Sequence, residues 1–104
     1  MRICAAQIKP TTGNILANIE NHLQFIDRAL SNGADAIIFP ELSLTGYEPT
    51  LAKNLATNAV DSRLSIFQKI SDQIGVTIGV GLPTINGNGF SISMILFQPN
   101  KPRL

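Results

Sequence analysis

Two short apolar segments, residues 3–8 and 35–39, constrain the fold of this 104-residue chain more than any other feature. Neither segment alternates between apolar and polar residues, and this pattern is typical of a β-strand that is buried on both faces. A third apolar run at 76–82 and an alternating run at 90–97 predict two further strands, joined by a hairpin with an Asn-Gly turn signal. The sequence therefore predicts a four-stranded sheet whose strands are apolar on both faces.

Two segments with helical periodicity separate these strands. After Asn14, which can cap a helix, apolar residues recur three or four positions apart until the Asn-Gly pair at 32–33, a natural helix end. This stripe consists of Ile15, Ile19, Leu23, Ile26 and Leu30. A second helix is predicted to begin at Asp61 or Ser62 and to end at Gly75. The order β-α-β-α-β-β indicates an α/β fold with three parallel strands and one antiparallel strand at the end.

The number of helices predicts an uncovered sheet face. Two helices can cover one face of a four-stranded sheet, whereas the strands are apolar on both faces. An apolar surface of this size is normally an interaction site. We therefore expect a homo-oligomer, or a complementary C-terminal segment on that face, in place of a compact monomer.

Composition excludes several classes of protein. Eight Lys and Arg balance seven Asp and Glu, so the excess of positive charge that nucleic-acid binding requires is missing. No apolar run reaches the roughly 18 residues that span a bilayer, and the N-terminus does not have the pattern of a signal peptide. A single Cys and a single His exclude an internal disulfide and a zinc site built from Cys or His clusters. We expect a cytoplasmic domain that binds neither nucleic acid nor membrane and holds no metal.

The segment after the second predicted strand carries the main candidate for chemistry. Sites in α/β sheets gather beyond the carboxyl ends of the parallel strands, and Glu41 is the first residue there, held by the restricted φ of Pro40. Its neighbours Phe39 and Leu42 are apolar, and apolar surroundings disfavour a charged carboxylate and so suit a general base. From position alone, a solvated, inert Glu in a turn is the competing interpretation.

The residues around Glu41 resemble a known motif. Residues 33–41, GADAIIFPE, and 42–47, LSLTGY, resemble the first signature of the nitrilase, or carbon–nitrogen hydrolase, superfamily. The opening strand, the first helix and the GVGLP stretch at 79–83 also resemble this family, so the resemblance covers nearly the whole chain. It implies that residues 1–104 are the N-terminal part of a four-layer αββα sandwich, in which each sheet packs on helices with one face and on the second sheet with the other.

The resemblance also implies a reaction. The family hydrolyses carbon–nitrogen bonds of small amides, nitriles or ureides without a cofactor, using a Glu that takes the thiol proton of a Cys, and a Lys that stabilises the oxyanion. Glu41 matches the Glu, whereas the positions of the Lys and the Cys fall beyond residue 104. We therefore expect a hydrolase in the complete enzyme and an inactive chain on its own. Tyr47 lies within the motif and is expected at the rim of the substrate pocket.

Two alternative functions stay open at this stage. The glutaminase domain of an ammonia-using synthetase has a similar stretch, PELSLTGY, at residues 40–47 of this numbering. A truncated α/β module that only associates with a partner is the second alternative.

Four other reactive or ionisable side chains are not expected to take part in catalysis. Cys4 lies among apolar residues of the first strand and is predicted to be a small buried thiol. Such surroundings make a thiol inert. Lys101 is predicted to be a solvated surface charge, and His22 a residue at the edge of the first helix. Glu48 lies near Tyr47, but its spacing assigns it no role.

Overall fold

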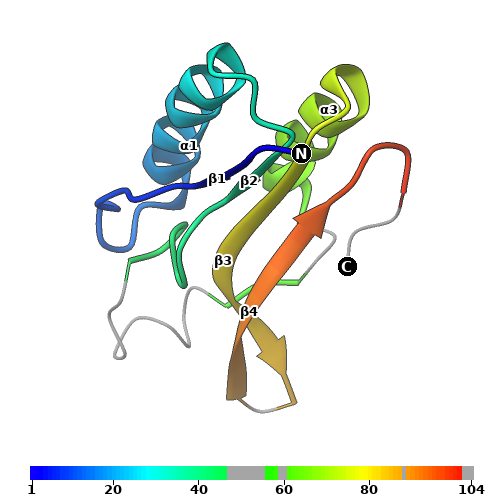
Figure 1. The fold of residues 1–104 in the computed structure, drawn as a ribbon. Helices are drawn as coiled ribbons and strands as arrows, with labels where there is room; N and C mark the ends of the chain where they lie inside the picture. The colour runs from blue at the N-terminus through cyan, green and yellow to red at the C-terminus, as the bar shows by residue number, and fades with distance from the viewer. Residues whose placement is uncertain (47–55, 59–60, 88, 102–104) are drawn as a thin grey trace.

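The computed structural model describes residues 1–46, 56–58, 61–87 and 89–101. The elements are β1 (Ile3–Ala5), α1 (Ile15–Ser31), β2 (Ala36–Ile38), the 3-10 turn η1 (Ser62–Leu64), α3 (Ser65–Ile74), β3 (Thr77–Asn86) and β4 (Gly89–Phe97). The sheet order is β1-β2-β3-β4, with β1, β2 and β3 parallel and β4 antiparallel to β3 (Figure 1). The predicted small α/β domain and its strand pairing are confirmed.

The ends of both helices follow from local capping. The side chain of Asn14 accepts a hydrogen bond from the first turn of α1, and Gly33 just beyond the helix has a φ of +77°. Asp61 caps η1, which leads directly into α3, and Gly75 ends α3 in the left-handed conformation. The sequence predicted these positions, with Ser62 as the alternative to Asp61.

The strands differ in length from the predicted ones. The first strand is shorter and lies at the edge of the sheet, where Ile3 is 67% exposed, so the expectation that it is buried on both faces is wrong for this chain. β3 continues past its predicted end at residue 82, through Pro83, to Asn86. The carbonyl of Pro83 points away from β4 and accepts a hydrogen bond from Thr57, so its missing N–H lies on that side and leaves the ladder to β4 intact.

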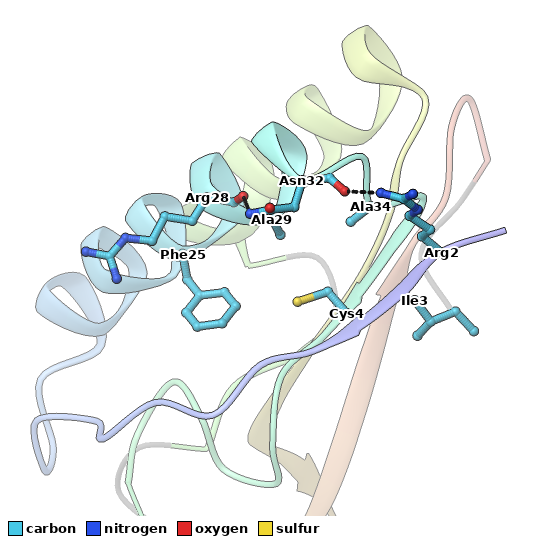
Figure 2. Close-up of a pocket in the computed structure, with 8 residues that line it drawn as sticks. All are labelled: Arg2, Ile3, Cys4, Phe25, Arg28, Ala29, Asn32 and Ala34. Carbon is cyan, nitrogen blue, oxygen red and sulfur yellow. Dashed lines mark hydrogen bonds between the residues drawn. The ribbon is translucent and has the colours of Figure 1, made fainter.

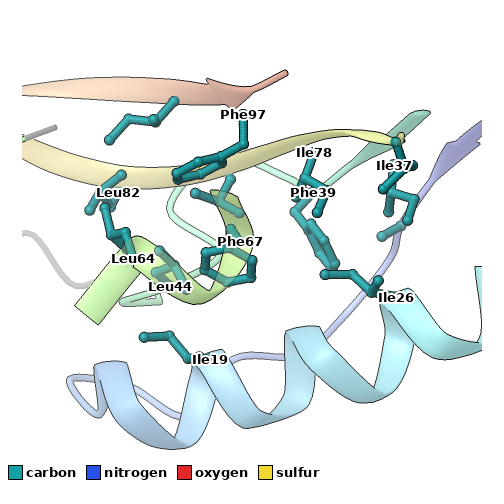
Figure 3. Packing of buried hydrophobic residues seen from close by; sticks show 14 of the residues in the cluster. Ile19, Ile26, Ile37, Phe39, Leu44, Leu64, Phe67, Ile78, Leu82 and Phe97 are labelled. Atoms are coloured by element: carbon teal, nitrogen blue, oxygen red, sulfur yellow. The ribbon is translucent and has the colours of Figure 1, made fainter. Parts of the chain in front are cut away.

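One face of the sheet carries the core. Both helices pack on this face, and the buried side chains between helices and sheet form a continuous cluster (Figure 3). Phe67 of α3 contacts Phe97 of β4 with ring centroids 5.5 Å apart. The central members of the cluster include Ile19, Ile26, Ile37, Phe39, Leu44, Leu64, Phe67, Ile78, Leu82 and Phe97.

The opposite face of the sheet is uncovered by the described residues, as the sequence predicts. A Cβ built on Gly79 would meet the side chains of Ile38, Met94 and Leu96, which therefore lie together on this face. Met94 is 44% exposed and Ile92, two residues along β4, is 46% exposed. We call this surface the open face. Among the described helices, none is long and apolar enough to cross a membrane.

Candidate active site

A tight turn at the carboxyl end of β2 carries the predicted base. The turn comprises residues 40–46 and is called the Glu41 turn below; the amide of Ser43 donates to the carbonyl of Pro40 at 3.1 Å. Leu42 has a φ of +54°, which is rare for a residue with a side chain, and it is buried. Glu41 itself is exposed. The enclosed apolar surroundings expected for its carboxylate are therefore not provided by the described residues.

Gly81 of β3 lets the Glu41 turn approach the sheet. A Cβ at this position would stand 2.5 Å from the carbonyl oxygen of Pro40 and 2.6 Å from the backbone nitrogen of Leu42. The amide of Leu44 donates to the carbonyl of Gly81 at 2.9 Å. The turn therefore rests directly on the backbone of β3, as expected for a glycine that marks close packing inside a strand.

Beside the turn, Glu41 borders a cavity of about 220 Å³ on the open face. Its other lining residues are Gly81, Ile92, Ser93 and Met94. The side chains of β4 give this hollow apolar walls, and the Glu41 carboxylate supplies a proton acceptor at its edge. This combination fits a small neutral substrate with one reacting polar group.

A buried polar side chain, Asn18 of α1, fastens the turn from the helix side. Its amide nitrogen donates to the carbonyls of Leu44 and Thr11, both at 2.8 Å, and its oxygen accepts from the amide of Thr11 at 2.6 Å. Asn18 is fully buried, and these contacts satisfy both ends of its amide. The sequence offered Asn18 only as part of the first helix, and its burial beside the apolar stripe was not predicted.

His22 lies one helical turn further along α1 and is also fully buried, so the prediction that it sits at the helix edge is wrong. Its ring packs 4.1 Å from the ring of Phe39 and 5.9 Å from that of Phe67, measured between centroids. Nε2 lies 2.9 Å from Oγ of Ser43. The Glu41 turn packs on the side of α1 that carries His22, and so buries this residue. The spacing of apolar residues along the helix could not reveal this contact.

The protonation of His22 follows from its surroundings. Burial lowers the pKa of His22 from 6.5 to about 4, and a hydrogen bond to the Asn18 carbonyl opposes this shift. The ring is therefore neutral at pH 7. Nδ1 lies 2.6 Å from that carbonyl, which can only accept, so Nδ1 carries the proton and Nε2 accepts from the hydroxyl of Ser43. The Ser43 oxygen in turn accepts from the amide of Gly81 at 3.1 Å.

The other candidate residues lie apart from Glu41. Cys4 is half-buried, where the sequence predicted a buried thiol, and it borders a separate cavity of about 410 Å³ between β1 and α1, together with Phe25 and Arg28 (Figure 2). Lys101 is exposed, as predicted. Tyr47 and Glu48 lie outside the described residues. Within the described ranges, no group of three or more His, Cys, Asp or Glu is arranged to hold a metal ion.

Comparisons with known proteins agree with the motif. Residues 2–103 match the family described as carbon-nitrogen hydrolase. The glutamine-dependent NAD(+) synthetases of Rhodobacter capsulatus and Thermotoga maritima are 30% and 26% identical to this chain over 91 and 98 residues. These alignments cover 85% and 92% of the chain, but 16% and 17% of the synthetases. The crystal structure of an amidase from Nesterenkonia sp. superposes with a TM-score of 0.74 at 25% identity, over 92% of this chain and 37% of the amidase.

The chain belongs to the carbon–nitrogen hydrolase family, which confirms the resemblance seen in its sequence. It spans about a sixth of the length of the curated relatives that it matches, and less than two fifths of the amidase.

Proposed function

We propose that Glu41 is the general base of a hydrolase that cleaves the carbon–nitrogen bond of a small amide, nitrile or ureide. The observation that carries this proposal is the position of Glu41: it is exposed at the carboxyl end of β2, on a turn fixed to β3, beside a cavity with apolar walls. A base that must receive a proton from an incoming group needs this combination of access and fixed position.

In the proposed reaction, the Glu41 carboxylate accepts the proton of a cysteine thiol, and the resulting thiolate attacks the substrate carbon. A lysine ammonium stabilises the negative charge that develops on the substrate oxygen or nitrogen. We assign the cysteine and lysine of the family to sequence outside residues 1–104. Cys4 borders a different cavity from Glu41, which argues against it as the nucleophile.

A second candidate function is the release of ammonia from glutamine for use by an attached or associated synthetase. The observation that favours it is the identity of the relatives, since both synthetases named above are glutamine-dependent. Glutamine is itself a small primary amide, so both candidates use the same chemistry at Glu41 and differ in the groups that bind the rest of the substrate.

The test is ammonia release by a hydrolase that contains this chain together with the family's Lys and Cys. Glutamine and a simple amide such as propionamide serve as substrates. We expect turnover that Glu41→Gln lowers by about 10²–10⁴-fold with either substrate. A kcat/KM for glutamine well above that for propionamide favours the synthetase-linked reading, and the reverse order favours a general amidase. Full turnover by the Gln variant contradicts the proposed role.

A further inference from the structure

A chain of buried hydrogen bonds links helix α1 to the turn that carries Glu41. We propose that His22 is a positioning residue, which fixes the Ser43 hydroxyl and, through it, the location of the Glu41 carboxylate. This inference rests on the proposed function, because it assumes that the location of Glu41 matters for turnover.

Ser43 is the joint of the arrangement. Its hydroxyl donates to Nε2 of His22 at 2.9 Å and accepts from the amide of Gly81 at 3.1 Å. One side chain thus connects α1, the Glu41 turn and β3. Because a hydroxyl has a single proton and rotates freely, the acceptor on His22 determines where that proton points and leaves the oxygen lone pairs for Gly81.

The position of Glu41 follows from these contacts. Before it, the amide of Phe39 donates to the carbonyl of Gly79 at 2.9 Å, and after it, the turn is tied to Gly81 through Ser43 and Leu44. Glu41 therefore stands between two anchoring points on the same strand, and the Ser43 hydroxyl supplies one of the two hydrogen bonds of the second.

Packing alone does not account for a histidine at this position. The ring lies among Phe39 and Phe67, and the buried side of α1 is otherwise formed mainly by Ile and Ala side chains. An apolar side chain would fill such a space without the cost of burying a polar ring. The property that His22 adds is an uncharged acceptor directed at Ser43.

Protonation of His22 would remove that acceptor. Among the described residues, the groups against the ring are Phe39, Phe67, the Ser43 hydroxyl and the Asn18 carbonyl, and none of them carries a charge. With no anion beside it, a protonated ring gains no charged partner, and Nε2 becomes a second donor, so the Ser43 hydroxyl loses its acceptor and its proton must turn away.

The experiment compares four variants in the hydrolase that contains this chain and the family's Lys and Cys. Ser43→Ala and His22→Leu remove the contact from either side, and His22→Gln restores an uncharged acceptor. Ser71→Ala is the matched control, because Ser71 is a buried helical serine whose hydroxyl bonds to the carbonyl of Phe97, away from the turn. The readouts are kcat, KM and the hydrogen exchange of the Gly81 amide.

We expect Ser43→Ala and His22→Leu to lower kcat by about tenfold to a hundredfold with little change in KM, the usual effect of a misplaced catalytic group. The Gly81 amide should exchange faster in both. His22→Gln should recover most of kcat and lose the acid dependence that His22 imparts near pH 4, and Ser71→Ala should leave kcat unchanged.

The inference is overturned if Ser43→Ala and His22→Leu keep the kcat of Ser71→Ala, or if all three lose it equally. Glu41→Gln separates this failure from failure of the proposed function. If Glu41→Gln loses turnover while Ser43→Ala and His22→Leu keep it, only the positioning role is wrong. If Glu41→Gln keeps turnover, the proposed base is wrong. The hydrogen exchange of the Gly81 amide then decides alone whether His22 anchors the turn.

Discussion

The α-carbon of Gly81 lies so close beneath the carbonyl of Pro40 that a Cβ on Gly81 would come within 2.5 Å of the carbonyl oxygen. This oxygen and the next nearest atom, the nitrogen of Leu42, both belong to the backbone, which cannot rotate away as a side chain can. The position of the Glu41 turn relative to β3 therefore depends on the absence of a side chain at residue 81.

Gly81→Ala should consequently displace the Glu41 turn and destabilise the fold, by about 1–3 kcal/mol as for other overpacked sites. Gly79→Ala is the matched control, because its Cβ would meet only the flexible ends of three side chains, at 3.0 to 3.2 Å. Urea denaturation of both variants measures the difference. An equal loss in the two variants would show that the contact with Pro40 is not the cause.

Replacement of the buried Asn18 by Leu should destabilise the fold. The buried Leu44 carbonyl would lose its partner, which costs about 1–3 kcal/mol, and the part-buried backbone of Thr11 would lose two more hydrogen bonds. Asn21→Leu on the exposed side of the same helix is the control. We expect the midpoint of thermal unfolding to fall clearly for the first variant only, and similar midpoints would contradict the assigned contacts.

The depressed pKa of His22 predicts a pH dependence of stability. The unfolded chain takes up a proton on His22 near pH 6.5, whereas the folded chain does so only near pH 4. The contribution of neutral, buried His22 to the free energy of unfolding is therefore fully present above pH 6.5 and declines as the pH falls. Near pH 4, about 3 kcal/mol of it is lost.

Urea denaturation between pH 4 and 7 measures this dependence, with His22→Leu as the comparison. Asp61 contributes at lower pH, because its hydrogen bond with the Arg63 side chain lowers the pKa of the carboxyl below its usual value. We expect the free energy of unfolding of the unmodified chain to fall between pH 7 and pH 4. For His22→Leu it should fall by about 3 kcal/mol less. Parallel curves would mean that His22 is not buried in the neutral form.

The open face predicts self-association of the isolated chain. Light scattering at high micromolar concentration should give a mass above the 11.2 kDa of one chain. Met94→Lys places a charge on the open face and should shift the chain toward the monomer, whereas Leu16→Lys changes a more exposed apolar residue of α1 and should not. A clean monomer of the unmodified chain would contradict the prediction.

Local signals in the sequence were sufficient for much of the fold. Asn14, Gly33 and Gly75 mark helix ends because capping depends on one or two neighbouring residues. The end of β3 was missed because the tolerance of a strand for Pro83 depends on which neighbour its backbone faces. This information lies in the pairing of segments far apart in the chain.

The site divides in the same way. Glu41 was found through the motif, and its place at the end of β2 follows from the order of the elements. The partnership of His22 with Ser43 could not be found, because the two residues are 21 positions apart and meet only once the turn packs on α1. The prediction of enclosed apolar surroundings for Glu41 was wrong for a related reason, since the described residues leave the open face uncovered.

The most direct test of the central claim is the kcat of Glu41→Gln in the hydrolase that contains this chain and the family's Lys and Cys. Gln keeps the size of the side chain but cannot accept the thiol proton, so kcat should fall by about 10²–10⁴-fold, while the unfolding midpoint stays close to that of the unmodified enzyme. Glu20→Gln, an exposed carboxylate on α1, should keep full turnover. A Glu41→Gln enzyme that turns over as fast as Glu20→Gln would show that Glu41 is not the base.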